Sequence, residues 1–500
     1  MSLDLKSVAV IGAGVMGRGI AQVLAAGGAN VILFDTRSGA VAEAASFVGQ
    51  MFDRAVERNR MKPDEAAAAK ARIKTAATLA EIAGVDLVVE AIVEDLNAKR
   101  ALFSELEKIV GTECVLATNT SSLSVTAIAA TCQKPQRVAG FHFFNPVPVL
   151  RVVEVVSALA TATEVADALV RLARRFGHEP VRAKDTPGFL INHAGRGFGP
   201  EGLRIVSEGI ATHAAVDDIL REGCGFAIGP FELYDVIGLD VSHTVIEEIY
   251  HQFYEEPRFR IPPETRTRVA AGLFGRKTGK GFYEYRDGKK VAPDPRPVPK
   301  DLPERVWLAP EARAPLGPII GDACPIDTGP QPDARSVCLF APIGKDATSC
   351  AVETGIEAER VLAVDTLFGL DTRRTLMTTP VTDPDLRDQV HALLARDGKP
   401  VTVIRDSPGF VAQRVVAHIV NIASDIAQQR IASPEDIDKA VRLGLAYPKG
   451  PLSWGDAIGP ARVLQILSAL HDFYKDPRYR PSPWLTRRAR LGVSLLTAET

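Results

Sequence analysis

The sequence is poor in cysteine for its length. Six cysteines are spread over 500 residues, and none of them forms a CxxC pair. A chain of this size can bury a sizeable core without covalent cross-links, and scattered cysteines are typical of proteins that stay reduced. We therefore expect no disulfide framework, no metal site and a cytoplasmic protein.

Long apolar runs and a strong excess of one charge are also lacking. No run approaches the roughly 18 apolar residues of a membrane-spanning helix. The N-terminus shows no basic segment followed by a separate apolar stretch, so we expect no signal peptide. The formal net charge is −2, which disfavours nucleic acid or a membrane as a partner. These absences leave a soluble globular protein of several domains.

A glycine motif is present close to the N-terminus. An apolar strand over 7–11 runs into GxGxxG, which is followed by a helix from about Val15 and a second apolar strand. In such a unit the glycines allow a tight turn, the approach of a pyrophosphate, and close packing of helix on strand. The three glycines are Gly12, Gly14 and Gly17. The pattern predicts a Rossmann-type dinucleotide site.

The second strand ends in an acid, Asp35, which lies 18 residues after Gly17. A carboxylate at this position accepts hydrogen bonds from the adenosine ribose and repels a 2′-phosphate. We therefore predict NAD as the cofactor, although Arg37 weakens the preference over NADP.

A further apolar strand at 114–118 continues into a polar loop. In an open parallel sheet, loops at the carboxyl ends of strands line the ligand crevice. Asn119, Ser121 and Ser122 occupy this loop. Their polar groups are equally well explained by contact with cofactor or substrate and by a turn with a helix cap.

One histidine and one glutamate lie among the apolar residues of two expected strands, 138–144 and 150–156. A reversal at the Asn-Pro-Val-Pro sequence of 145–148 would pair two strands and place His142 across from Glu154. A carboxylate beside an imidazole fixes its tautomer and stabilises its charged form. The pair is therefore a candidate for general acid–base catalysis.

Seven motifs in order over about 1–286 resemble the L-3-hydroxyacyl-CoA dehydrogenase family. They are GAGVMGRGIAQ, LVVEAIVEDL, NTSSL, GFHFFNPVPVL, DTPGF-xx-N, GPFEL-x-D-xx-GLD and GRKTGKGFYEY. The resemblance implies an α/β Rossmann-type NAD-binding domain followed by an all-α domain like that of 6-phosphogluconate dehydrogenase. The implied reaction oxidises the 3-hydroxyl of an acyl-CoA to a ketone and passes hydride to NAD.

The resemblance also implies roles for particular residues. His142 would be the general base and Glu154 its orienting partner, while Ser121 and Asn192 would hydrogen-bond the substrate. The glycines of the motif would hold the pyrophosphate, and Asp35 the ribose. Four further residues fall where the family lines its cofactor: Glu94, Lys99, Asn119 and Lys277. A basic stretch falls where the family meets CoA phosphates, although a solvated helix face explains it equally well: Arg54, Arg58, Arg60 and Lys62.

The sequence departs from the family just after Asn192. Glycines at 195, 197 and 199 and a proline at 200 replace a smooth apolar helix. These residues should weaken or kink the helix, and glycines also allow a ligand or another helix to approach closely. We therefore expect an altered acyl pocket, and the sequence does not set the acyl-chain length.

Part of the chain is repeated at an offset of 221 residues. DTPGF at 185–189 matches DSPGF at 406–410, and the match continues without a gap for some 50 residues. In each copy Thr186 or Ser407 can cap a helix that begins at the following proline. The second copy has Asp365 where His142 stands and Gln413 where Asn192 stands. We therefore expect one active site and one degenerate copy.

The repeat suggests five segments. They are an NAD-binding domain at 1–184, a helical domain at 185–286, a proline-rich linker at 287–335, a truncated α/β segment at 336–405 that does not bind NAD, and a second helical domain at 406–500. Relatives use the helical domain to pair subunits. We therefore expect either a homo-oligomer or a second copy that replaces the dimer contact within one chain.

Two other functions are also compatible with the sequence. One is a different NAD-linked β-hydroxyacid dehydrogenase, of the 3-hydroxyisobutyrate or 6-phosphogluconate type, which relies on a catalytic lysine. The other is a non-catalytic NAD-binding protein on the same fold. The favoured interpretation is oxidation of a short-chain 3-hydroxyacyl-CoA or of 3-hydroxyadipyl-CoA.

Overall fold

The computed structural model describes residues 4–291 and 297–499 and divides the chain into two compact units. The first unit is Met1–His193 together with Gln429–Leu445. The second is Ala194–Gln428 together with Ala446–Thr500. Each unit therefore contains residues from both halves of the sequence. Within the described ranges, no helix combines the length and the apolar character needed to cross a membrane.

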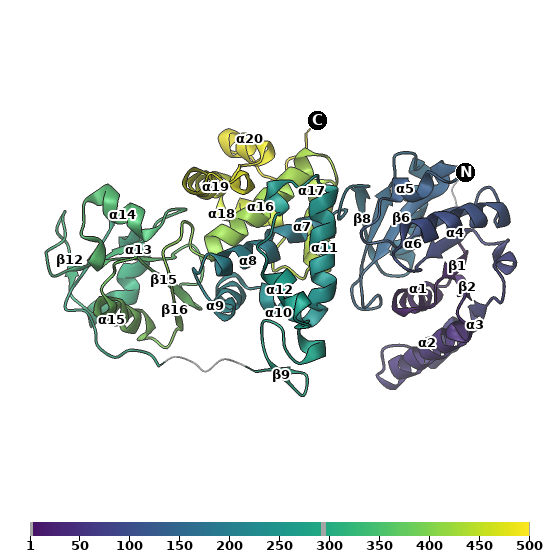
Figure 1. Cartoon of the computed structure of the whole chain (residues 1–500), viewed down its shortest axis with the longest axis horizontal. Helices are drawn as coiled ribbons and strands as arrows, with labels where there is room; N and C mark the ends of the chain where they lie inside the picture. Colours follow the sequence, from purple (N-terminus) through teal and green to yellow (C-terminus); the bar gives the residue numbers. More distant parts are fainter. Residues whose placement is uncertain (1–3, 292–296, 500) are drawn as a thin grey trace. The chain divides into compact units, whose positions relative to one another are not determined.

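The first unit is built on an eight-stranded sheet with the strand order β3-β2-β1-β4-β5-β6-β7-β8 (Figure 1). All neighbours are parallel except β6 and β7. The strands are β1 (Ser7–Ile11), β2 (Asn30–Phe34), β3 (Ile73–Thr75), β4 (Leu87–Glu90), β5 (Val115–Thr118), β6 (Val138–Phe143), β7 (Val152–Ser157) and β8 (Glu179–Lys184). The order of β3 to β6 is that of a doubly wound dinucleotide-binding fold.

Helices cover both faces of this sheet, which explains the continuous apolar strands. Val8 and Val10 of β1 belong to one buried cluster, and Ala9 and Ile11 belong to a second cluster on the opposite face. The first cluster includes residues of α1 (Val15–Ala26), α2 (Ala40–Glu57), α3 (Pro63–Ala71) and α6 (Thr163–Arg175). The second includes residues of α4 (Leu96–Ile109) and α5 (Val125–Ala129). The predicted Rossmann-type domain is confirmed.

The second unit contains a smaller sheet with the order β12-β11-β13-β14-β15-β16. Its strands are β11 (Val306–Leu308), β12 (Ile326–Asp327), β13 (Val337–Phe340), β14 (Val361–Val364), β15 (Arg374–Thr378) and β16 (Val401–Ile404), with helices α13 (Pro310–Ile320), α14 (Ala347–Thr354) and α15 (Pro384–Ala395). As with β6 and β7, β14 and β15 pair antiparallel. The described part of this sheet shows no strand–glycine loop–helix–strand unit like that of β1 to β2.

The predicted linker at 287–335 is wrong over much of its length. Two strands of the second sheet and helix α13 lie within it, so the α/β segment begins near Val306 rather than at 336. Two prolines inside α13, Pro315 and Pro318, hide its helical pattern. Part of the remaining stretch, 292–296, lies outside the described residues.

Two sets of helices and a short hairpin of β9 (Tyr285–Arg286) and β10 (Lys289–Lys290) make up much of the rest of the second unit. The first copy supplies α8 (Gly199–Ser207), α9 (His213–Asp218), α10 (Pro230–Ile237), α11 (Leu239–Gln252) and α12 (Glu264–Ala270). The second copy supplies α16 (Ala412–Gln428), α18 (Pro451–Ile458), α19 (Pro460–Tyr474) and α20 (Pro483–Leu491), while its α17 (Pro434–Gly444) belongs to the first unit.

The glycine-rich segment after Asn192 lets the two copies approach closely. As expected, the helix is broken there: α7 (Ile191–Ala194) ends in a 3-10 turn, η3 (Gly195–Gly197), before α8 begins. The equivalent region of the second copy is the uninterrupted helix α16. A Cβ atom on Gly197 would lie 2.8 Å from the Cα atom of Ile419 in α16. The glycine therefore accommodates a helix of the other copy.

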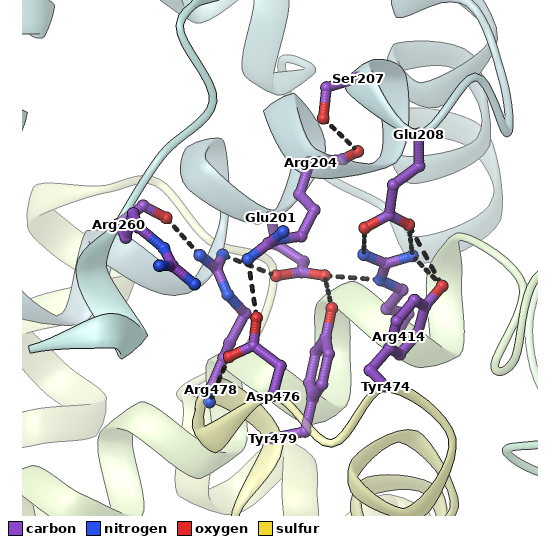
Figure 2. Close-up of polar contacts among 10 residues, drawn as sticks. All are labelled: Glu201, Arg204, Ser207, Glu208, Arg260, Arg414, Tyr474, Asp476, Arg478 and Tyr479. Atoms are coloured by element: carbon purple, nitrogen blue, oxygen red, sulfur yellow. Dashed lines mark hydrogen bonds and ion pairs between the residues drawn. The ribbon is translucent and has the colours of Figure 1, made fainter.

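Buried charges also join the copies. The carboxylate of Glu201 on α8 accepts hydrogen bonds from three fully buried side chains of the second copy (Figure 2). These are Arg414 (Nε to Oε1, 2.6 Å), Arg478 (Nη1 to Oε2, 3.2 Å) and Tyr479 (hydroxyl to Oε1, 2.6 Å). One acid of the first copy is thus surrounded by groups of the second.

Candidate active site

His142 and Glu154 are paired as the sequence predicted. They face each other in the antiparallel register of β6 and β7, and the imidazole Nδ1 lies 2.6 Å from Oε2 of Glu154. Both side chains are buried. Because Nδ1 donates its proton to the carboxylate, Nε2 is the nitrogen that can accept one.

The second carboxylate oxygen of Glu154 is held by backbone amides that sequence reasoning missed. Oε1 accepts from the N–H groups of Leu190 (3.0 Å) and Ile191 (2.8 Å). These amides follow the DTPGF turn, in which Gly188 and Phe189 have left-handed backbone (φ 72° and 49°). The turn directs two successive N–H groups toward Oε1, while Oε2 pairs with His142. Both oxygens of Glu154 are therefore held by hydrogen bonds.

The predicted helix start at Pro187 is wrong. The left-handed residues of the turn delay the helix to Ile191, and the Thr186 hydroxyl donates to the Phe189 carbonyl (3.5 Å) instead of capping a helix. The second copy repeats this geometry, with Gly409 and Phe410 also left-handed (φ 71° and 52°).

Ser121 and Asn192 are neighbours in the first unit. The side-chain amide of Asn192 lies 3.5 Å from the carbonyl oxygen of Ser121. Asn192 directly follows Ile191, whose amide contacts Glu154. The four predicted catalytic-site residues are therefore linked through neighbouring contacts in one region.

The loop after β5 is wrapped around Glu94. Its carboxylate accepts from the Thr120 hydroxyl (2.6 Å) and from the amides of Ser121 (2.9 Å) and Ser122 (3.2 Å). Burial acts to raise the pKa of Glu94, but the charge of Lys99 and these hydrogen bonds outweigh it and hold the pKa below its ordinary value. The loop is thus anchored by a charged carboxylate.

Lys99 is buried and sits between two acids. Its ammonium lies 2.6 Å from Glu90 and 3.2 Å from Glu94. Glu90 ends β4 and also accepts from the Thr118 hydroxyl (2.6 Å). Sequence reasoning missed Glu90, whose signal is an acid at the end of an apolar strand. Lys99 therefore supports the loop through its carboxylate partners.

Asn119 ties the same loop to β6, the strand of His142. Its Oδ1 accepts from the amide of Phe143 at 2.8 Å, next to His142. This contact favours a structural role for Asn119 in the turn over a direct contact with cofactor or substrate. The hydroxyl of Ser121 stays a candidate for contact with a ligand.

The glycine motif has the geometry that a dinucleotide requires. Gly12 has φ 102°, and a Cβ on Gly17 would lie 1.7 Å from the Gly12 carbonyl oxygen, so no side chain fits there. A Cβ on Gly14 would meet nothing within 4 Å, which leaves the start of α1 open. An open helix N-terminus is suited to phosphate groups, so these residues fit a pyrophosphate.

Asp35 braces this loop from the end of β2. Its Oδ2 accepts from the amide of Ala13 at 2.8 Å, and Oδ1 accepts from the amide of Arg37 at 2.9 Å. Burial acts to raise the pKa of Asp35, but these amides and the Arg37 guanidinium hold it below its ordinary value. The acid is therefore charged at neutral pH.

The remaining predicted site residues, a basic stretch and Lys277, lie in other parts of the chain. The basic residues Arg54, Arg58, Arg60 and Lys62 are exposed on α2 and the turn that follows it. Lys277 belongs to the second unit, where its ammonium lies 2.5 Å from Asp240. That pairing holds the pKa of Asp240 below its ordinary value.

Comparison with known proteins decides the family. The model of the 3-hydroxyacyl-CoA dehydrogenase NAD binding domain matches residues 7–186. The model of the C-terminal domain of the same enzymes matches twice, at 188–285 and at 409–494. The chain belongs to the 3-hydroxyacyl-CoA dehydrogenase family. The double match confirms the predicted duplication.

Individual relatives agree with this family, some of them over nearly the whole chain. The chain is 36% identical to 3-hydroxyadipyl-CoA dehydrogenase of Escherichia coli K12, over 98% of this chain and 99% of the relative. It is 37% identical to human mitochondrial hydroxyacyl-coenzyme A dehydrogenase, over 56% of this chain and 92% of the relative. The crystal structure of 3-hydroxybutyryl-CoA dehydrogenase from E. coli K12 superposes with a TM-score of 0.86, at 35% identity and covering 98% and 99% of the two chains.

Family membership settles the cofactor and the class of reaction. This 3-hydroxyacyl-CoA dehydrogenase uses NAD and oxidises 3-hydroxyacyl-CoA thioesters. The alternative of a lysine-dependent β-hydroxyacid dehydrogenase is therefore not supported.

The equivalent place in the second copy holds a buried pair of side chains, Asp365 and Gln413. Asp365 follows β14, and its backbone faces Thr375, the position that Glu154 occupies in the first copy. Gln413 donates to Asp365 Oδ1 (3.0 Å) and accepts from the Gly344 amide (2.9 Å). Burial raises the pKa of Asp365 to about 6. No imidazole–carboxylate pair is present at this place.

Proposed function

We propose that His142 is the general base in the oxidation of L-3-hydroxyacyl-CoA and that Glu154 orients it. The hydrogen bond of 2.6 Å between Nδ1 and Oε2 carries this proposal. It leaves Nε2 to take the proton of the substrate hydroxyl, and the buried carboxylate stabilises the imidazolium that results. NAD, held at the glycine motif, would supply the acceptor for the hydride that leaves carbon 3. No other base is required, because the proton and the hydride together complete the oxidation.

Ser121 and Asn192 position the substrate in this proposal. The side-chain amide of Asn192 contacts the carbonyl oxygen of Ser121, and the preceding residue, Ile191, is held by its hydrogen bond to Glu154. Gly12, Gly14 and Gly17 hold the pyrophosphate and Asp35 the ribose. Glu94, Lys99 and Asn119 shape the loop beside the cofactor, and a cofactor contact of Lys277 stays a prediction. The exposed Arg54, Arg58 and Lys62 suit CoA phosphates, which favour basic side chains.

The proposed substrate is a short-chain or an ω-carboxylated six-carbon acyl-CoA. One relative over the whole chain is named for 3-hydroxyadipyl-CoA, and one structural relative for 3-hydroxybutyryl-CoA. We expect NADH formation from both thioesters, with kcat/KM falling for long acyl chains. Steady-state NAD reduction over a panel of 3-hydroxyacyl-CoA chain lengths measures this. No NADH from any thioester would instead support a non-catalytic NAD-binding protein.

We further propose that the second copy takes the place of a partner subunit. Reciprocal contacts between the copies support it. Arg258 donates to the Arg480 carbonyl (3.2 Å), and Arg478 donates to the Arg260 carbonyl. Such exchange is typical of a two-fold interface. Light scattering should therefore give the mass of one chain, 53.7 kDa; a stable dimer would show that the duplication adds to a subunit contact.

A further inference from the structure

Helix α17 of the second copy is part of the unit that carries the candidate active site. It packs along β8 of the first sheet and also contacts β7, the strand of Glu154. Three polar contacts hold this segment: the Lys184 amide donates to the Ile431 carbonyl (2.9 Å), the Arg182 amide donates to Asp436 (3.2 Å), and the Lys439 ammonium lies 2.8 Å from Glu179. This one segment of the degenerate copy, Gln429–Leu445, therefore lies against the sheet of the proposed catalytic pair.

The last residue of α17, Gly444, packs so closely against Ile191 that a side chain on it would clash. A Cβ atom on Gly444 would lie 2.6 Å from Cδ1 of Ile191 and 3.2 Å from its Cγ2. The backbone of Gly444 is not in the left-handed region, so alanine is allowed there by conformation and favours a helix. What glycine supplies at this position is space for the isoleucine.

Ile191 in turn holds the carboxylate of the catalytic pair. Its amide donates to Oε1 of Glu154 at 2.8 Å, while Oε2 lies 2.6 Å from His142. Ile191 and Glu154 are fully buried, and a close-packed interior transmits a displacement to its neighbours. A side chain on Gly444 would therefore act on Glu154 through Ile191.

We infer that Gly444 and helix α17 of the second copy are positioning elements for the Glu154–His142 pair of the first copy. This inference rests on the proposed function of that pair. The second copy has Asp365 and Gln413 at the matching positions, but its helix α17 supports the site of the first copy.

The repeat provides a matched control. In the second unit the Arg405 amide donates to the Ile210 carbonyl (3.0 Å), which mirrors the contact between Lys184 and Ile431. Gly223 corresponds to Gly444, and a Cβ on it would lie 3.6 Å from Gly369, an ordinary contact. No catalytic pair lies on this side of the repeat.

Gly444→Ala should lower kcat about tenfold, because small misplacements of catalytic groups cost up to about a hundredfold. The primary deuterium isotope effect on kcat, measured with substrate deuterated at carbon 3, should rise as the chemical step slows. Adding Ile191→Val removes the nearest methyl group and should restore kcat. Gly223→Ala should leave kcat and the isotope effect unchanged.

The outcomes separate this inference from the proposed function. An inactive wild-type chain would overturn the proposed function. Two results with an active wild type would overturn this inference alone. One is a folded Gly444→Ala variant with unchanged kcat, and the other is an impaired variant whose kcat Ile191→Val does not restore.

If Gly444→Ala does not fold, Lys439→Gln tests the inference instead, because it loosens α17 without introducing a clash. A loss of kcat of at least about twofold with a raised isotope effect supports the inference, and unchanged values overturn it. Glu222→Gln, in the ion pair with Arg373 on the mirrored side, is its control.

Discussion

His142→Gln is expected to lower kcat by at least about a hundredfold, the usual contribution of a positioned general base. Glutamine can still donate a hydrogen bond to Glu154, so the variant should keep the strand pairing around it. It cannot accept the hydroxyl proton, because its amide nitrogen is not basic. Steady-state NADH formation from 3-hydroxybutyryl-CoA measures the loss.

Asp365→Asn is the matched control for this change. Asp365 occupies the position of His142 in the degenerate copy, and asparagine keeps the Oδ1 acceptor that Gln413 and the Leu367 amide use. We expect its kcat to equal that of the wild type. NAD binding, followed by quenching of protein fluorescence, should survive in both variants. Near-normal turnover of His142→Gln would show that another group takes the proton.

The sequence was informative where a site depends on short-range patterns. The Asn-Pro-Val-Pro turn joins two apolar strands, and it sets the register that pairs His142 with Glu154. The GxGxxG spacing likewise predicted a tight turn at Gly12 and close packing at Gly17, where a Cβ would lie 1.7 Å from the Gly12 carbonyl oxygen. In both cases a few consecutive residues determine the local geometry.

Contacts between distant parts of the chain were not predictable in this way. The amides that hold Glu154 belong to a turn with a left-handed phenylalanine, a conformation that no pattern in the sequence indicates. The packing of α17 on β8 joins residues some 250 positions apart. Helix α13 was missed because internal prolines, which normally end a helix, lie in it.

Glu201→Gln is expected to destabilise the second unit by about 3 kcal/mol, because removing one partner of a buried ion pair leaves the other charges uncompensated. Arg414, Arg478 and Glu201 are all fully buried. Arg414 keeps a second partner in Glu208 (2.8 Å), so the penalty falls mainly on Arg478. Thermal and urea unfolding followed by circular dichroism measure the change.

Glu208→Gln provides the comparison, because this carboxylate is 24% exposed and also pairs with Arg414. Water can replace part of its interaction, so we expect a loss below about 1 kcal/mol. Equal losses in the two variants would contradict a special role for the buried acid.

The pH dependence of the Glu201→Gln effect gives a second test of the buried charge. Burial acts to raise the pKa of Glu201, but Arg414 and Arg478 outweigh it and hold the pKa well below the ordinary value. A carboxyl group with a lowered folded-state pKa stabilises the fold above its unfolded pKa, and this stabilisation is lost as pH falls through the folded value. The difference between wild type and Glu201→Gln should therefore be full at pH 7 and shrink only below about pH 4. A difference that is independent of pH down to strong acid would mean that shape, and not charge, joins the two copies at Glu201.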